Sequence, residues 1–362
     1  MAKKNKHTSA LHEKKGVSDP EITNISHINK FKKKRKAQPD AQSLTQDIIS
    51  GDITALSRAI TLVESTNPTH YKKASEIIKQ CLEHANNSTR IGITGVPGVG
   101  KSTFIEAFGE YLTSQGKKVA VLAVDPSSSV TKGSILGDKT RMEALVNNPN
   151  AFIRPSASGN SLGGVARKTR EAIILCEAAG FDTIIIETVG VGQSETAVHS
   201  MVDFFLLLKL ARAGDELQGI KRGIIEMADA IAINKADGDN IKAAKLAKVE
   251  FNRALHLYPE KASGWTPKVT LCSALQKEGI DDIWKIISEY LTKTKTNGYF
   301  EHNRLEQNKF WLTQTIEEQL KQRFFNHEVI KKALATQLQL IEDNKTTPFA
   351  AAEYLLNLEK DL

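Results

Sequence analysis

The sequence contains only three cysteines among 362 residues, and no apolar run approaches the roughly 20 residues of a membrane span. Cys81, Cys176 and Cys272 lie far apart, with no Cys-x-x-Cys pair and no histidine at ligand spacing. This argues against a cysteine-based metal site and favours a reducing compartment, with Cys176 and Cys272 in the core. The lysine-rich N-terminus lacks the apolar segment of a secretory signal. We therefore expect a cytoplasmic protein.

The net charge of +7 is confined to one end of the chain. Residues 1–40 contain 11 Lys and Arg against 4 Asp and Glu, whereas the remaining 322 residues contain 38 of each sign. The cluster at 32–36 has the charge to contact nucleic acid, acidic lipid or an acidic partner. We interpret residues 1–40 as a basic disordered tail. The neutral body argues against a nucleic-acid partner.

The rest of the chain divides into three segments by its hydrophobic pattern. Residues 41–88 have helical periodicity and predict an N-terminal helical extension. Residues 89–297 alternate short apolar runs with amphipathic stretches, which is typical of an α/β domain with a doubly wound, mainly parallel sheet. Residues 298–362 carry three helical stripes that either pack on the α/β domain or form a dimerisation arm. The expected strands are 90–95, 118–125, 151–155, 183–187, 204–210, 230–234 and 268–272.

A glycine-rich segment between an expected strand and an expected helix matches the phosphate-binding pattern G-x-x-x-x-G-K-[ST]. Backbone N–H groups and the helix N-terminus of such a unit point at a polyphosphate. We expect Lys101 to reach the outer phosphates and the Ser102 hydroxyl to coordinate Mg²⁺. The segment therefore predicts a nucleoside triphosphate-binding protein. Its residues are Gly95, Val96, Pro97, Gly98, Val99, Gly100, Lys101 and Ser102.

Two further segments predict that the base is guanine. Asn234-Lys235-Ala236-Asp237 ends a strand and matches N-K-x-D. An ionised Asp237 can accept from the N1–H and 2-amino groups of guanine, whereas adenine would leave that carboxylate unpaired. We expect Asn234 to hold the loop and the Lys235 stem to cover the base. The segment Ser273-Ala274-Leu275 follows another strand, and a backbone N–H there is expected to meet guanine O6.

Three carboxylates and one basic loop are candidate catalytic groups. Glu187 ends a strand, where it would hold Mg²⁺ through a water or polarise the attacking water. Asp125 ends another strand near the same edge, and Asp138 follows in a polar segment as a candidate base or metal partner. The alternative for both aspartates is a helix cap or turn. Lys221 and Arg222 lie in a polar loop, where either could neutralise transition-state charge. The alternative is that this segment is an ordinary surface loop.

Taken together, these segments resemble the MeaB/ArgK GTPases, bacterial relatives of the human methylmalonic aciduria type A protein. The resemblance covers roughly residues 45 to 340, and the runs E-T-V-G-V-G-Q-S-E and G-D-E-L-Q-G-I-K are highly specific. Where common GTPases have D-x-x-G, this chain has Glu187-Thr-Val-Gly190. The matching segments are 95–103, 125–130, 187–195, 214–221, 234–237 and 273–275.

The resemblance implies a P-loop G domain of the SIMIBI class, helical extensions and a homodimer built through the C-terminal region. It implies a GTPase that binds GTP, GDP and Mg²⁺ and acts as a G-protein chaperone for adenosylcobalamin-dependent methylmalonyl-CoA mutase. When the family's site residues are carried over to this sequence, Thr103 joins Lys101 and Ser102 in binding phosphate and Mg²⁺. The metal and water-activating carboxylates are Asp125, Asp138 and Glu187, and Lys221 belongs to a partner-responsive loop.

Three other functions have less support in the sequence. A metal-insertion GTPase needs thiolate or imidazole ligands, but the nine histidines are scattered. An ATP-dependent kinase of a lysine/arginine/ornithine transport system is disfavoured by Asn-Lys-Ala-Asp and by the lack of H-R-D and D-F-G. A nucleic-acid-associated G protein would rely on the basic tail alone. The sequence does not distinguish among B12-dependent acyl-CoA mutases as partner.

Overall fold

The computed structural model describes residues 39–65, 67–124, 142–155, 162–188, 194–211 and 222–360, without the side chains of Pro68, Leu162, Gly163 and Arg222. Within these residues a seven-stranded sheet has the order β3-β2-β4-β1-β5-β6-β7. Every neighbouring pair of strands is parallel, as the sequence predicted. The strands are β1 Thr89–Gly95, β2 Val119–Val124, β3 Ala151–Arg154, β4 Thr183–Thr188, β5 Phe204–Leu210, β6 Ala230–Asn234 and β7 Lys268–Leu271.

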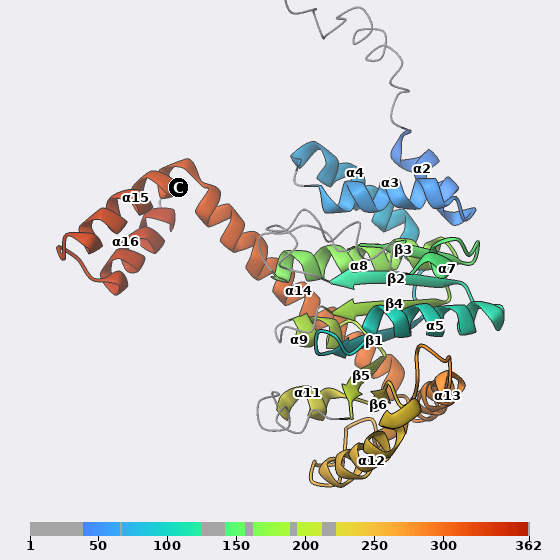
Figure 1. Cartoon of the computed structure of the whole chain (residues 1–362). Coiled ribbons are helices and arrows are strands. Elements are labelled where there is room, and N and C mark those ends of the chain that lie inside the picture. The colour runs from blue at the N-terminus through green and yellow to red at the C-terminus, as the bar shows by residue number, and fades with distance from the viewer. Residues whose placement is uncertain are drawn as a thin grey trace, which may run out of the picture. The chain divides into compact units, whose positions relative to one another are not determined.

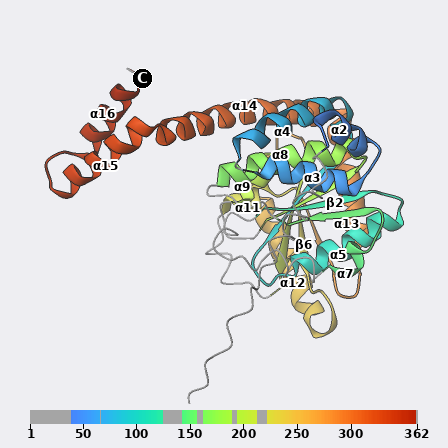
Figure 2. The same ribbon diagram turned by 90° about the horizontal axis from the view of Figure 1, so that it is seen from above.

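Helices cover both faces of the sheet, so its central strands are apolar on consecutive positions. In β2, Ala120 and Leu122 contribute to a core shared with α8, whereas Val119 and Val121 face a core shared with α5. Figure 2 shows α8 (Leu162–Ala178) on one side of β2 and α5 (Lys101–Ser114) on the other. A third core lies between β5, β6 and α12 (Ile241–Leu255). The doubly wound α/β prediction is therefore confirmed.

Shorter elements connect these layers in the order that Figure 1 traces along the chain. Many of them follow a strand at its carboxyl end, which is where a doubly wound sheet places its binding loops. They are α7 Glu143–Val146, α9 Ser194–His199, α11 Arg222–Met227 and the 3₁₀ turn η2 Gly238–Asn240. The longer helix α13 (Ile280–Thr296) comes after β7.

Three helices precede the sheet and pack over α8. They are α2 (Ala41–Ile49), α3 (Ile53–Glu64) and α4 (Pro68–Cys81), followed by a 3₁₀ turn, η1, at Leu82–His84. The break between α2 and α3 has a local cause. Gly51 has a φ of 88°, and the Asp52 side chain accepts hydrogen bonds from the first-turn N–H groups of α3. Buried leucines and isoleucines of α2 and α3 join the core that covers β2 and β4.

The last three helices are α14 (Tyr299–Asn326), α15 (Glu328–Glu342) and α16 (Pro348–Lys360). The first part of α14 is bonded to the segment between α9 and β5. Arg304 forms a two-bond ion pair with the buried Asp203, at 2.8 and 2.7 Å. The Gln307 amide donates to the Val202 carbonyl at 2.8 Å, and the indole N–H of Trp311 donates to the Ser200 carbonyl at 3.0 Å.

All three cysteines are buried and free, which confirms the core assignment of Cys176 and Cys272. Among the helices that the structure describes, none combines the length and apolar character that crossing a membrane requires.

Candidate nucleotide-binding site

The predicted phosphate and base segments lie at one edge of the sheet, at the carboxyl ends of β1, β6 and β7. Parallel strands deliver their carboxyl ends to the same edge, so loops far apart in sequence meet there. The loop after β1 spans residues 96–100, and α5 begins directly at Lys101. Asp125, Asp138 and Lys221 lie outside the described residues.

The phosphate-binding loop depends on glycine at specific positions. Gly98 and Gly100 have φ angles of 81° and 94°, which side chains with a Cβ rarely adopt. A Cβ on Gly100 would lie 2.9 Å from the Asn234 amide nitrogen. The loop is exposed at Pro97 and Gly98, whereas Val99 is fully buried beneath it. Its outer backbone is therefore open to a ligand.

The Lys101 side chain folds back onto the start of the phosphate loop. Its Nζ donates to the Gly95 carbonyl at 2.7 Å and lies 3.4 Å from the Val96 carbonyl. Burial lowers the pKa of Lys101, and the carboxylates of Glu187 and Glu195 oppose that shift. A partly desolvated ammonium with two carboxylates nearby is a group that phosphate oxygens can bind.

Asn234 connects the predicted base loops, residues 234–237 and 273–275, to the phosphate loop, residues 95–102. Its Nδ2 donates to the Val99 carbonyl at 2.9 Å, and its Oδ1 accepts from the Ala274 N–H at 3.1 Å. The Lys235 Nζ donates to the Gly98 carbonyl at 3.0 Å. Asn234 is almost fully buried, so these bonds form away from water. The three predicted segments are thereby held as one unit.

The carboxylate of Asp237 is oriented by a neighbouring hydroxyl. Ser273 Oγ donates to Asp237 Oδ2 and accepts from the Gln276 N–H. Leu275 is 75% exposed at the rim of the same loop, and the Lys235 side chain is exposed beside it. Asp237 is thus half-buried, and the exposed Lys235 and Leu275 side chains belong to the same two loops.

Sequence reasoning missed two contacts near this site. Thr188 Oγ1 donates to Thr94 Oγ1 at 2.8 Å, which joins the end of β4 to the end of β1 beneath the loop. Glu195, at the start of α9, is 1% exposed and acts electrostatically on Lys101. The conspicuous run after β4 contained Glu195, but only the packing of α9 brings its charge near the phosphate loop.

This fold and the meeting of its loops define a P-loop GTPase. A family model described as methylmalonyl Co-A mutase-associated GTPase MeaB matches residues 56–329, and the chain belongs to this family. A probable GTPase of Mycobacterium tuberculosis is 48% identical over 316 residues, covering 87% of this chain and 94% of the relative. GTPase ArgK of Escherichia coli is 46% identical over 298 residues, covering 82% and 90%.

A mouse protein named methylmalonic aciduria type A homolog, mitochondrial, is 44% identical over 335 residues, covering 90% of this chain and 81% of the relative. Among solved structures, one titled LAO/AO transport system kinase superposes with a TM-score of 0.71 at 37% identity. It covers 90% of this chain and all of the matched chain. The fold and the GTPase class predicted from the sequence are thus confirmed.

Proposed function

We propose that this GTPase is a chaperone of an adenosylcobalamin-dependent methylmalonyl-CoA mutase, governing cofactor loading and protection of the mutase. The observation that carries this proposal is the family match over residues 56–329, whose description names the mutase. The similarity to the mouse methylmalonic aciduria type A homolog supports the same partner. The nucleotide site supplies the chemistry, since GTP binding and hydrolysis at one sheet edge can alternate the loops between two states.

For GTP, we propose that Lys101 exchanges its loop carbonyls for the outer phosphates and that the loop backbone surrounds them. Asp237, held by Ser273, would read the guanine N1–H and 2-amino groups. Leu275 and the Lys235 stem would cover the ring. Ala274 already donates its N–H to Asn234, which makes the Leu275 N–H our candidate donor to guanine O6.

Mg²⁺ suits the oxygen donors that the described residues place near Lys101. Ser102 lies in the first turn of α5 and Glu187 at the end of β4, and both are partly exposed. Hydroxyl and carboxylate oxygens are the ligands that Mg²⁺ prefers. We propose Ser102 and Glu187, with Thr103 beside them, as the Mg²⁺-binding groups. Asp125 and Asp138 remain the other proposed carboxylates and Lys221 the proposed partner-responsive residue.

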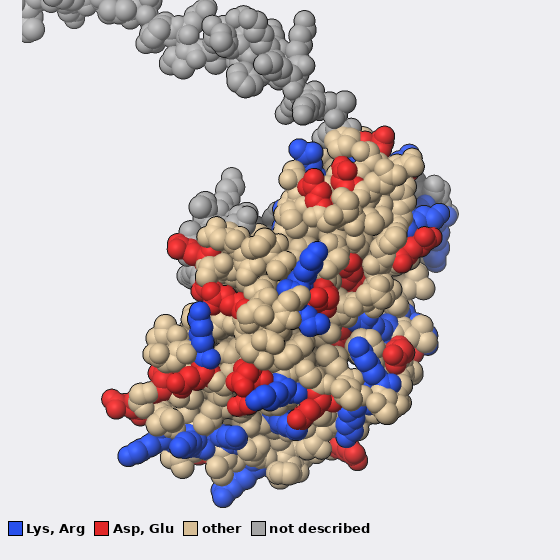
Figure 3. Space-filling model, turned by 90° about the vertical axis from the view of Figure 1, so that its right-hand side faces the viewer, with Lys and Arg blue, Asp and Glu red and all other residues tan. Residues whose placement is uncertain are grey.

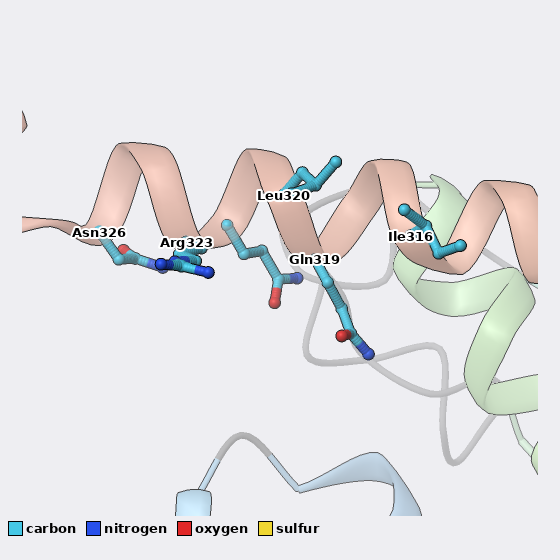
Figure 4. A pocket seen from close by; sticks show the side chains of 6 residues that line it. Ile316, Gln319, Leu320, Arg323 and Asn326 are labelled. Atoms are coloured by element: carbon cyan, nitrogen blue, oxygen red, sulfur yellow. The ribbon is translucent and has the colours of Figure 1, made fainter. Parts of the chain in front are cut away.

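We also propose that the C-terminal helices form a homodimer contact. Leu312, Ile316 and Leu320 follow one another at four-residue spacing on α14 and are 65%, 50% and 58% exposed. Figure 4 shows Ile316 and Leu320 along this helix, with Gln319 and Arg323 beside them. Apolar side chains at this spacing form a surface suited to a second helix. Light scattering should give a dimer that Leu320→Glu dissociates and Thr313→Glu, on the same helix, leaves intact.

The alternatives have weaker support. The transport-kinase title belongs to a structural relative, and a guanine-reading carboxylate would leave ATP poorly bound. A metal-insertion GTPase would need thiolate or imidazole ligands, and the sequence has no Cys-x-x-Cys pair to supply them. The face in Figure 3 interleaves basic and acidic side chains, which gives no broad cationic surface there for nucleic acid.

The deciding experiment measures GTP and ATP turnover with and without a B12-dependent mutase from the same source. We expect slow turnover of GTP alone, no ATP turnover, and faster GTP turnover when the mutase is added. A mutase that leaves GTP turnover unchanged would contradict the chaperone proposal while keeping the GTPase. Lys101→Ala, which removes the phosphate-binding amine, distinguishes turnover by this protein from a contaminant.

A further inference from the structure

A small cavity of about 210 Å³ lies between α8, α9 and α14, apart from the nucleotide-binding loops. Its lining includes Arg167 and Arg170 from α8, Ser200 after α9, and Thr315 and Glu318 from α14. Sites for drug-sized ligands occupy about 300–1,000 Å³, so this cavity suits only a small molecule or ion. None of its lining residues belongs to the predicted nucleotide site.

Arg170 is the unusual member of this lining. It is only 8% exposed, and no described residue accepts a hydrogen bond from its Nε–H. Its guanidinium carbon lies 3.7 Å from the centre of the Trp311 ring, and its Nη2 donates to Ser200 Oγ at 2.6 Å. No carboxylate among the described residues lies within 4 Å of it, although such pairs are the rule for buried arginines.

The described charged side chains around the cavity leave the Arg170 guanidinium without a direct ion pair. Arg167 pairs with Glu171 at 3.2 Å and stacks on Tyr71. Glu318 lines the cavity but forms no ion pair within 4 Å with either arginine, and burial raises its pKa above the usual range despite their opposing influence. Burial likewise lowers the pKa of Arg170 to about 9, so the guanidinium is poorly compensated. An added negative charge would compensate it.

We propose that this cavity binds a small oxyanion, a carboxylate or phosphate group, through Arg170. The Trp311 ring takes one face of the guanidinium plane and Ser200 takes one N–H. The Nε–H of Arg170 has no acceptor among the described residues, and the planar N–H groups of a guanidinium match two oxygens of one oxyanion. The hydroxyl of Thr315 lines the same space and supplies a further donor, as does the amide of Gln314, which also donates to Glu317 Oε2 at 3.2 Å.

An anion bound in this cavity would lie between α9, which follows the nucleotide-binding edge, and α14, which begins the C-terminal extension. The helix α9 begins at Ser194, shortly after β4 and Glu187, and ends beside Ser200. Trp311, which stacks on Arg170, donates to the Ser200 carbonyl from α14. An anion on Arg170 would therefore touch both the helix that follows the nucleotide edge and the helix that leads into the C-terminal extension. This proposal is independent of the mutase as partner.

The test is isothermal titration calorimetry of the full chain with inorganic phosphate and, separately, with acetate. The protein is first saturated with Mg²⁺ and a GTP analogue that resists hydrolysis, because phosphate would otherwise bind the nucleotide site. We expect saturable binding of at least one probe at one site per chain. Tighter binding of phosphate than of acetate would identify a phosphate ligand, and the reverse order a carboxylate.

Four variants decide where the probe binds. Arg170→Gln should weaken binding at least about tenfold, because it removes the charge and fork. Thr315→Leu should do the same by filling the cavity from a half-buried helix position, while leaving Arg170 in place. Glu318→Gln should tighten binding about threefold by removing a like charge. Lys168→Gln is the matched control on α8, since it loses one positive charge outside the lining.

The proposal is overturned if neither probe binds saturably, or if binding persists unchanged in both Arg170→Gln and Thr315→Leu. It is also overturned if Glu318→Gln weakens binding, because the site would then prefer a cationic group. Circular dichroism and unfolding curves for Thr315→Leu and Lys168→Gln establish that their effects on binding do not come from loss of the fold.

Discussion

The Asn234 amide nitrogen donates a hydrogen bond to the Val99 carbonyl oxygen at 2.9 Å, across 135 residues of sequence. The other atom of the same amide accepts from the Ala274 N–H. One buried side chain therefore sets the spacing between the phosphate loop and both base loops. A bound guanine nucleotide must reach the phosphate loop and the base loops at the same time, so this spacing matters for affinity.

Replacement of Asn234 by alanine should weaken GDP binding and lower stability together. The Val99 carbonyl and the Ala274 N–H would lose their partner in a buried place, at about 1–3 kcal/mol for each group. Urea unfolding and GDP titration measure the two effects. Asn240→Ala is the control, because the Asn240 side chain makes an exposed hydrogen bond to the Lys235 carbonyl. Equal losses in both variants would contradict the proposed role of Asn234.

Gly100→Ala and Gly98→Ala form a matched pair. Both residues have positive φ, so each substitution strains the backbone by about 1–2 kcal/mol. Only the new Cβ at Gly100 would meet the Asn234 amide, whereas nothing lies within 4 Å of a Cβ at Gly98. We expect Gly100→Ala to lose more GDP affinity and more stability. Indistinguishable affinities and midpoints in urea would show that the contact is unimportant.

Asp237→Asn should exchange guanine for xanthine specificity. The amide keeps an oxygen for the Ser273 hydroxyl, but it presents an N–H where guanine also presents donors. Affinity for GDP should fall at least about a hundredfold, and affinity for the xanthine nucleotide should rise. Competition titrations with the two diphosphates measure this exchange. Asp239→Asn, exposed two residues later, should leave both affinities as they are.

Glu177 should contribute stability that is lost in acid. Burial raises its pKa, but Arg90 at 2.9 Å, Ser88 and the Asn86 N–H outweigh burial and lower the pKa below its usual 4.5. A lowered folded-state pKa means that the contribution is complete above the unfolded pKa. It disappears as the pH falls from about 4.5 through the folded value.

Glu177→Gln should therefore cost about 3–5 kcal/mol at neutral pH, because it leaves the buried Arg90 unpaired. Urea unfolding across pH should show the two proteins converging below pH 4.5. Glu289→Gln, which breaks an exposed pair with Lys268, should cost less than about 1 kcal/mol. A constant difference between Glu177→Gln and the parent protein down to low pH would contradict this account.

The expected strands agree with the structure to within one residue at either end, because apolar runs covered on both faces are distinctive in sequence. For β5 and β6 the expected and observed bounds are the same. The glycine positions of the phosphate loop were equally predictable, since positive φ leaves few alternatives. By contrast, nothing in the sequence paired Thr94 with Thr188, because such a pairing depends on strand order rather than on local pattern.

The amino-acid sequence by itself determined the strand and helix segments, the glycine-rich loop after β1, the Asn-Lys-Ala-Asp segment after β6 and membership of a GTPase family. Each of these depends on short-range spacing, which a chain carries whatever its tertiary contacts. Only the tertiary structure placed Glu195 near Lys101, joined Asn234 to Val99, and left Arg170 buried against Trp311 without a carboxylate. These relationships depend on which helices pack together, and burial is what makes their charges and hydrogen bonds energetically important.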